Sequence, residues 1–139
     1  MLILNRDIAI DRKVLLSTVW IFVLINMVYA DIIGMLRPGY VELLERMSKE
    51  LNSETVLTFS VLMEIPIGMI LLSRILPRKS NRTMNFVAVP VSVIYVIFGG
   101  LDDPPISYLF FGTVEILAML CVLGISYKWK KEILSGGNQ

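Results

Sequence analysis

The sequence predicts an all-α membrane protein: a membrane-embedded four-helix bundle formed by one transmembrane domain of 139 residues. Hydrophobic residues make up 55% of the chain, and the mean hydropathy is +0.71. The apolar residues gather into stretches of roughly 20 residues, each long enough to cross a ~30 Å hydrocarbon layer as a helix. Helices are expected because every backbone amide in lipid must be satisfied within its own segment, and the alternation typical of a membrane barrel is absent.

Four such stretches follow one another with short connections. They cover about residues 14–36, 55–76, 83–101 and 107–126. Pro66 lies inside the second span and removes the amide partner of the Leu62 carbonyl, so we expect the second span to bend there.

The connection between the first and second spans is more than a loop. Apolar residues recur in it at helical spacing, and charged residues fill the remaining faces. This pattern predicts a short amphipathic helix over about residues 40–52. Such a helix either lies in the outer membrane interface or folds over the bundle as a lid.

The positions of the basic residues predict the topology. Ten of the thirteen lysines and arginines precede the first span, flank the connection between the second and third spans, or follow the fourth. The other three, Arg37, Arg46 and Lys49, lie between the first and second spans. The positive-inside rule therefore predicts a multi-pass protein of the plasma (inner) membrane with both termini in the cytoplasm. The polar tail, residues 135–139, is expected to be disordered.

Several classes of function are excluded by composition. The chain has no histidine and one cysteine, Cys121, so an intrachain disulfide, a Cys/His metal site and a histidine-ligated haem are not expected. The net charge is +1, and no basic stripe interleaved with aromatic residues indicates nucleic-acid binding. We therefore predict no metal and no cofactor, and the lipid bilayer is the one partner that composition implies.

Two acidic residues inside the spans are the main candidates for function. Glu64 and Glu115 lie near the middle of the second and fourth spans, which run in the same direction, so both carboxyl groups are expected at nearly the same depth. A charge at that depth is costly, and such residues usually face the bundle interior. We expect the pair to face each other or a shared ligand, and at least one carboxyl group to be protonated at neutral pH.

Three further polar residues are candidates for ligand or proton handling. Ser60 shares a helical face with Glu64, Asn26 lies near mid-depth in the first span, and Asp31 lies closer to its outer end. For Asn26 a hydrogen bond between helices is the interpretation we favour. For Asp31 a structural and a functional role are equally consistent with the sequence.

A set of spaced residues is similar to a known family. These are Ser17-Thr18-Val19-Trp20, Tyr29-Ala30-Asp31, Met63-Glu64-Ile65-Pro66, Asn81-Arg82 and Glu115-Ile116. Together they resemble an uncharacterised family of small prokaryotic four-helix membrane proteins, a domain of unknown function. The resemblance implies the four-span architecture and no established activity. A looser likeness to DoxX-type four-helix proteins rests on architecture alone, which does not imply function.

Three functions are compatible with these observations. The first is binding of a small or amphiphilic ligand, or proton handling, through Glu64 and Glu115; a transporter of this size would need a homodimer. The second is a structural or interaction subunit that binds a partner membrane protein and no ligand. The third is an intramembrane enzyme that uses the two carboxyl groups as acid and base, which we favour least because no catalytic motif is present.

Overall fold

The structure, a computed structural model, describes residues 11–99 and 104–129. Within these ranges the chain forms five helices and no strand: α1 (Arg12–Met35), α2 (Tyr40–Glu50), α3 (Ser53–Ile75), α4 (Arg78–Gly99) and α5 (Ile106–Lys128). The tail that was expected to be disordered, residues 135–139, lies outside the described residues.

Four of these helices, α1, α3, α4 and α5, are long and apolar enough to cross a membrane, which confirms the predicted fold class. The helix α4 begins at Arg78, before the predicted start of the third span near Thr83. The first turn of α4 is closed by a hydrogen bond in which the amide of Asn81 donates to the carbonyl of Pro77 at 2.9 Å.

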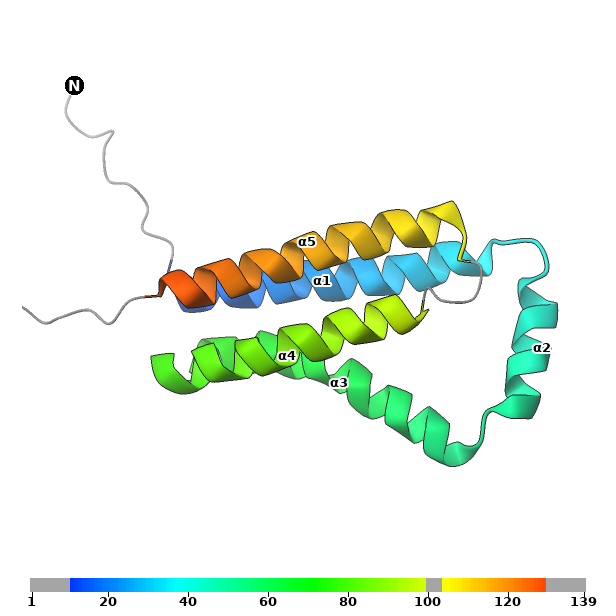
Figure 1. The fold of residues 1–139 in the computed structure, drawn as a ribbon, viewed down its shortest axis with the longest axis horizontal. Coiled ribbons are helices and arrows are strands. Elements are labelled where there is room, and N and C mark those ends of the chain that lie inside the picture. The colour runs from blue at the N-terminus through cyan, green and yellow to red at the C-terminus, as the bar shows by residue number, and fades with distance from the viewer. Residues whose placement is uncertain (1–10, 100–103, 130–139) are drawn as a thin grey trace, which may run out of the picture.

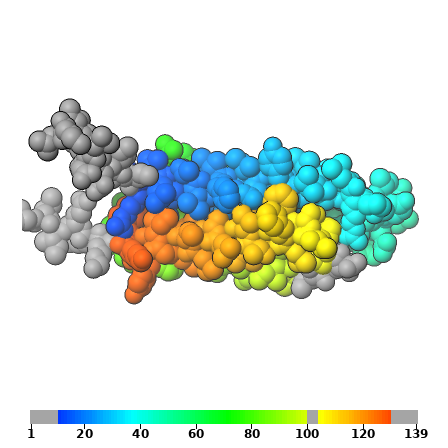
Figure 2. All heavy atoms as spheres, turned by 90° about the horizontal axis from the view of Figure 1, so that it is seen from above, coloured from blue at the N-terminus to red at the C-terminus, as the bar shows by residue number. Residues whose placement is uncertain are grey.

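The four long helices form a closed ring of contacts. α1 packs against α3 and α5, and α4 packs against the same two helices, so α3 and α5 lie diagonally opposite each other. Helix α1 begins and α5 ends at one end of the bundle, which we call the terminal end; the other we call the α2 end (Figure 1). Figure 2 shows the face on which α1 and α5 run side by side along the length of the molecule.

The short helix α2 is present where the sequence predicts one, and it lies across the end of the bundle (Figure 1). None of its residues is buried. Gly39 precedes it with φ 79°, a left-handed conformation that favours glycine and turns the chain from α1 into α2. The side of the membrane on which α2 lies stays a prediction.

The first half of α3 diverges from the rest of the bundle (Figure 1). The buried residues of α3 are Pro66, Met69 and Ser73, all in its second half. Pro66 stands at the start of that half, and it has no amide to donate to the carbonyl of Leu62. As a result, four helices pack together at the terminal end, whereas α1, α4 and α5 alone do so towards the α2 end.

A chain of buried hydrogen bonds connects three helices at the terminal end. The Trp20 indole Nε1 donates to Asn85 Oδ1 at 2.8 Å, and Asn85 Nδ2 donates to Asn81 Oδ1 at 2.7 Å. Asn81 Nδ2 then donates to the carbonyl of Ser73 at 2.6 Å. That carbonyl needs a side-chain donor because Pro77, four residues later, has no amide. The network therefore links α1 and α4 to the end of α3.

Further polar contacts strengthen this end. Ser17 Oγ donates to the carbonyl of Ile70 at 2.9 Å, and Arg74 Nε donates to Ser17 Oγ at 3.2 Å. Arg78 Nε donates to the carbonyl of Trp129 at 3.0 Å. Apolar side chains fill the remaining interior, among them Leu16, Val23, Met27, Met69, Val89, Met119 and Val122.

The hydrogen-bond network makes a prediction about stability. Asn85→Ala leaves the buried Trp20 Nε1 without its acceptor and the buried Asn81 Oδ1 without its donor. It should therefore lower the free energy of unfolding by about 1–2 kcal/mol. The measurement is unfolding in detergent micelles followed by circular dichroism. Asn26→Ala is the matched control, because among the described residues the Asn26 side chain bonds to the Phe22 carbonyl of its own helix and to no other helix. Equal effects of both substitutions would contradict the assignment.

Candidate functional site

Glu115 lies inside the bundle, as the sequence analysis expected. Its side chain is 3% exposed, and it faces inward together with Gly112 and Met119 of α5. Its Oε1 is buried and has no hydrogen-bond partner among the described residues. A buried polar atom without a partner is rare and often marks a place where a water, an ion or a ligand binds.

Gly112 determines how Glu115 is enclosed. A Cβ atom built at Gly112 would lie 3.2 Å from Cγ1 of Val96 on α4, closer than ordinary van der Waals contact. The absence of a side chain at Gly112 therefore lets α5 approach α4. One turn further along α5, the carboxyl group of Glu115 is covered by protein.

Glu64 does not face the interior, and this prediction was wrong. Its side chain is exposed and lines an apolar groove between α3 and α4. The inward face of α3 is taken by Pro66, Met69 and Ser73, and Pro66 is turned about 200° around the helix from Glu64. A Cβ atom at Gly68, one turn after Glu64, would meet nothing within 4 Å, so α3 and its neighbours in the described structure leave open space at this point of the groove.

Asp31, and not Glu64, is the second acidic residue that interacts electrostatically with Glu115. The groups that interact electrostatically with Glu115 within the described ranges are Asp31 on α1, Tyr95 on α4 and Tyr108 on α5. All four side chains are acids or phenols, and we call them the carboxyl–phenol cluster. Asp31 is exposed, both tyrosines are half-buried and Glu115 is buried.

The position of Tyr108 is fixed by its hydroxyl group. It donates to the carbonyl of Val96 at 3.2 Å. Gly99 provides the space, since a Cβ atom there would collide with the hydroxyl oxygen of Tyr108. The sequence analysis did not select the two tyrosines as site residues. The spacing of Tyr108, Gly112 and Glu115 on one face of α5 is the signal that identifies Tyr108.

The two remaining candidates lie apart from the cluster. Asn26 Nδ2 donates to the carbonyl of Phe22 at 2.8 Å, and Ser60 Oγ donates to the carbonyl of Val56 at 2.9 Å. Both bonds stay within one helix. The expectation that Asn26 bonds between helices was therefore wrong.

Ser92 provides a further polar atom in the interior. It lies one turn before Tyr95 and Val96 on α4, it is buried, and its hydroxyl group has no partner among the described residues. Ser92 and Glu115 thus contribute unpartnered buried oxygens from the adjacent helices α4 and α5. Such atoms are the usual partners of a buried water or of the polar end of a ligand.

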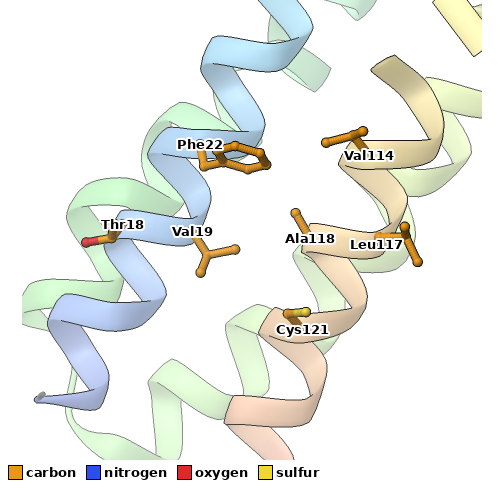
Figure 3. A pocket seen from close by; sticks show the side chains of 7 residues that line it. All are labelled: Thr18, Val19, Phe22, Val114, Leu117, Ala118 and Cys121. Atoms are coloured by element: carbon orange, nitrogen blue, oxygen red, sulfur yellow. The ribbon is translucent and has the colours of Figure 1, made fainter. Parts of the chain in front are cut away.

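An apolar groove of about 510 Å³ runs between α1 and α5 (Figure 3). Val19 and Phe22 line it from α1, and Val114, Ala118 and Cys121 line it from α5. No charged side chain lines this groove, so it offers acyl chains a surface but no group that would select a ligand. No set of three or more His, Cys, Asp or Glu side chains in the described residues could hold a metal ion.

Comparison with known proteins identifies a family and no function. A family model described as "Family of unknown function (DUF6326)" matches residues 1–136, which is nearly the whole chain. No curated protein matches the chain, and no solved structure does. The likeness to DoxX-type proteins stays a prediction.

The close packing at Gly112 can be tested. Gly112→Leu places a branched side chain against Val96 and must separate α4 from α5. We therefore expect a loss of about 1–3 kcal/mol in the free energy of unfolding. Gly124→Leu is the control, since a Cβ atom there meets nothing within 4 Å. Leucine forms helices better than glycine, so this control should be neutral or stabilising. Similar losses for both variants in thermal unfolding would refute the proposed packing.

Proposed function

We propose, for a chain that belongs to the DUF6326 family of unknown function, that it binds a small amphiphilic cation at the carboxyl–phenol cluster, with Glu115 as the acceptor. The proton is the smallest cation that this site would hold. We also propose that the protein resides in the plasma membrane with both termini in the cytoplasm. The positions of the basic residues support this orientation, because ten of thirteen belong to the side of the termini.

One observation carries the proposal: Glu115 is buried and its Oε1 lacks a hydrogen-bond donor among the described residues. A buried carboxylate is strongly destabilising unless a donor or a positive charge reaches it. Its electrostatic neighbours Asp31, Tyr95 and Tyr108 bring no positive charge. A protonated amine would supply both the missing donor and the missing charge, and the two phenol rings suit a cation.

The arrangement of the helices provides a route to Glu115. The first half of α3 diverges from the bundle, so the part near the α2 end has three packed helices instead of four (Figure 1). Asp31 is exposed in this part and interacts electrostatically with Glu115. A cationic head group would reach Asp31 first and then Glu115, while its apolar tail stays in contact with hydrocarbon.

A second function, that of an interaction subunit, is favoured by a separate observation. Glu64 is exposed in the middle of a membrane-spanning helix, where lipid offers it no partner. Another protein surface would cover it. The hypothesis of an acid–base enzyme that uses Glu64 together with Glu115 is not favoured, because Glu64 is exposed on the outside of the bundle and Glu115 is buried inside it.

Binding of a hydrophobic cation tests the proposed site. The protonated aromatic amine 2-phenylethylammonium, which carries both a positive charge and N–H donors, is titrated into the full-length protein in nanodiscs of zwitterionic lipid, and binding is followed by calorimetry. Glu115→Gln keeps the shape of the side chain but removes its charge, and it should weaken binding by at least about tenfold. Asp31→Asn should weaken binding less, because Asp31 is exposed to a more polar surrounding.

The matched control is Glu64→Gln, the same substitution near the middle of another span and outside the cluster. It should bind the cation like the unchanged protein. Equal affinity of the unchanged protein and Glu115→Gln would contradict the proposal. So would an equal loss in Glu64→Gln, because that would indicate an effect that is not specific to the cluster.

A further inference from the structure

A regular row of residues runs along the outward side of α3. They follow one another at alternating steps of four and three residues: Leu57, Val61, Glu64, Gly68, Leu71 and Ile75. We call this row the α3 seam. Its apolar members are exposed. The alternating spacing is that of two helices packed with a left-handed crossing, which is also the commonest packing of membrane helices.

Apolar exposure alone is what any helix in contact with lipid shows, but Glu64 needs a different explanation. It lies near the middle of the seam and lines a groove of about 360 Å³ whose other walls are apolar, with Val61 and Gly68 from α3 and Val87 and Ala88 from α4. No hydrogen bond or ion pair of Glu64 is present in the described part of the chain. Because hydrocarbon cannot supply one, something must cover this carboxyl group in the membrane.

Gly68 is the second unusual member of the seam. It lies one turn after Glu64, and a Cβ atom built there meets nothing within 4 Å. No contact with the described residues therefore requires a glycine at this position, where glycine weakens the helix. Small residues between membrane helices allow their backbones to approach closely. A helix from outside the chain would explain both residues at once.

Of the four long helices, α3 is also the least buried. Three of its residues are buried, compared with six in α1. Its first half diverges from the bundle and contains no buried residue, and α5 lies on the diagonally opposite side. The seam shares no residue with the carboxyl–phenol cluster, so an interface on α3 would leave that site accessible.

We propose that a second copy of this chain covers the seam, with α3 packed against α3 around a two-fold axis along the membrane normal. Two copies inserted in the same direction place both Glu64 side chains at the same depth, on either side of the axis. A carboxyl group that carries a proton donates and accepts hydrogen bonds, so two of them form a complementary pair. A lipid acyl chain has no such group, and a lipid head group lies at the membrane surface instead of mid-depth.

Cysteine cross-linking of the full-length protein in liposomes tests this interface. Cys121→Ser removes the native thiol, and Val61→Cys or Leu71→Cys then places one thiol on the seam. Leu120→Cys is the matched control, an exposed position on the opposite helix α5. Mild oxidation should cross-link both seam variants into dimers and leave the α5 variant monomeric. Because all three positions are exposed, none of these changes should disturb folding.

Two substitutions then test the central contacts by the cross-linked fraction in the Val61→Cys background. Gly68→Ile blocks the close approach of the two helices, and Glu64→Leu removes the polar pair, so each should weaken dimerisation about tenfold. Glu64→Gln keeps a hydrogen-bond donor and an acceptor and should therefore preserve the dimer. Equal cross-linking at Leu120→Cys, or monomers at every protein-to-lipid ratio, would overturn the proposal. A lipid or a different protein that stays bound to the monomer and is lost in Glu64→Leu would likewise replace the second copy as the occupant.

Discussion

Hydrocarbon offers no hydrogen-bond partner, and this constraint determines where each polar side chain of the spans lies. Some polar side chains return to a carbonyl of their own helix, as Thr18 does with Val14 and Thr113 with Leu109. Others bond across helices in the interior, as Trp20 does with Asn85. The first kind can face lipid without a neighbour, whereas the second kind fixes which helices pack together.

Proline connects this constraint to the shape of the molecule. Pro77 ends α3 and leaves the Ser73 carbonyl to Asn81, and this bond joins α3 to α4 at the terminal end. Pro66 has the opposite effect. The residues of α3 that precede it diverge from the bundle, and none of them is buried. The second half of α3 is therefore packed in the bundle, whereas its first half presents an exposed surface. The proposed cation site and the proposed dimer seam both depend on this asymmetry.

Much of the fold could be predicted because it depends on apolar length alone. The four spans, their order and the short helix after Gly39 are local features of the sequence, and the described helices lie close to the predicted ranges. The rotation of each helix about its axis could not be predicted in the same way. The face with Ser60, Glu64 and Gly68 and the face with Pro66, Met69 and Ser73 are both plausible interior faces until the neighbouring helices are known.

The candidate site, like the fold, could be predicted only in part from the sequence. The depth of Glu115 and its small neighbour Gly112 are visible in the sequence, and the structure buries Glu115 as expected. Its electrostatic neighbour Asp31 was a candidate, but only the packing of α1 beside α5 brings the two acids into one cluster. Asn81 carries part of the family resemblance, yet its role in the Trp20 network follows from contacts between helices that are distant in the sequence.

The α5 face that carries Glu115 must point inward if Glu115 is to bind a ligand inside the bundle, and one distance in the bilayer tests this orientation. In the Cys121→Ser background, Val96→Cys combined with Gly112→Cys places two thiols where Val96 of α4 lies against Gly112 of α5. Oxidation in liposomes should form a disulfide within one chain, detected as a faster-migrating monomer on a non-reducing gel. The absence of that bond, or disulfides that form only between chains, would show that this face is turned to lipid and would contradict the account.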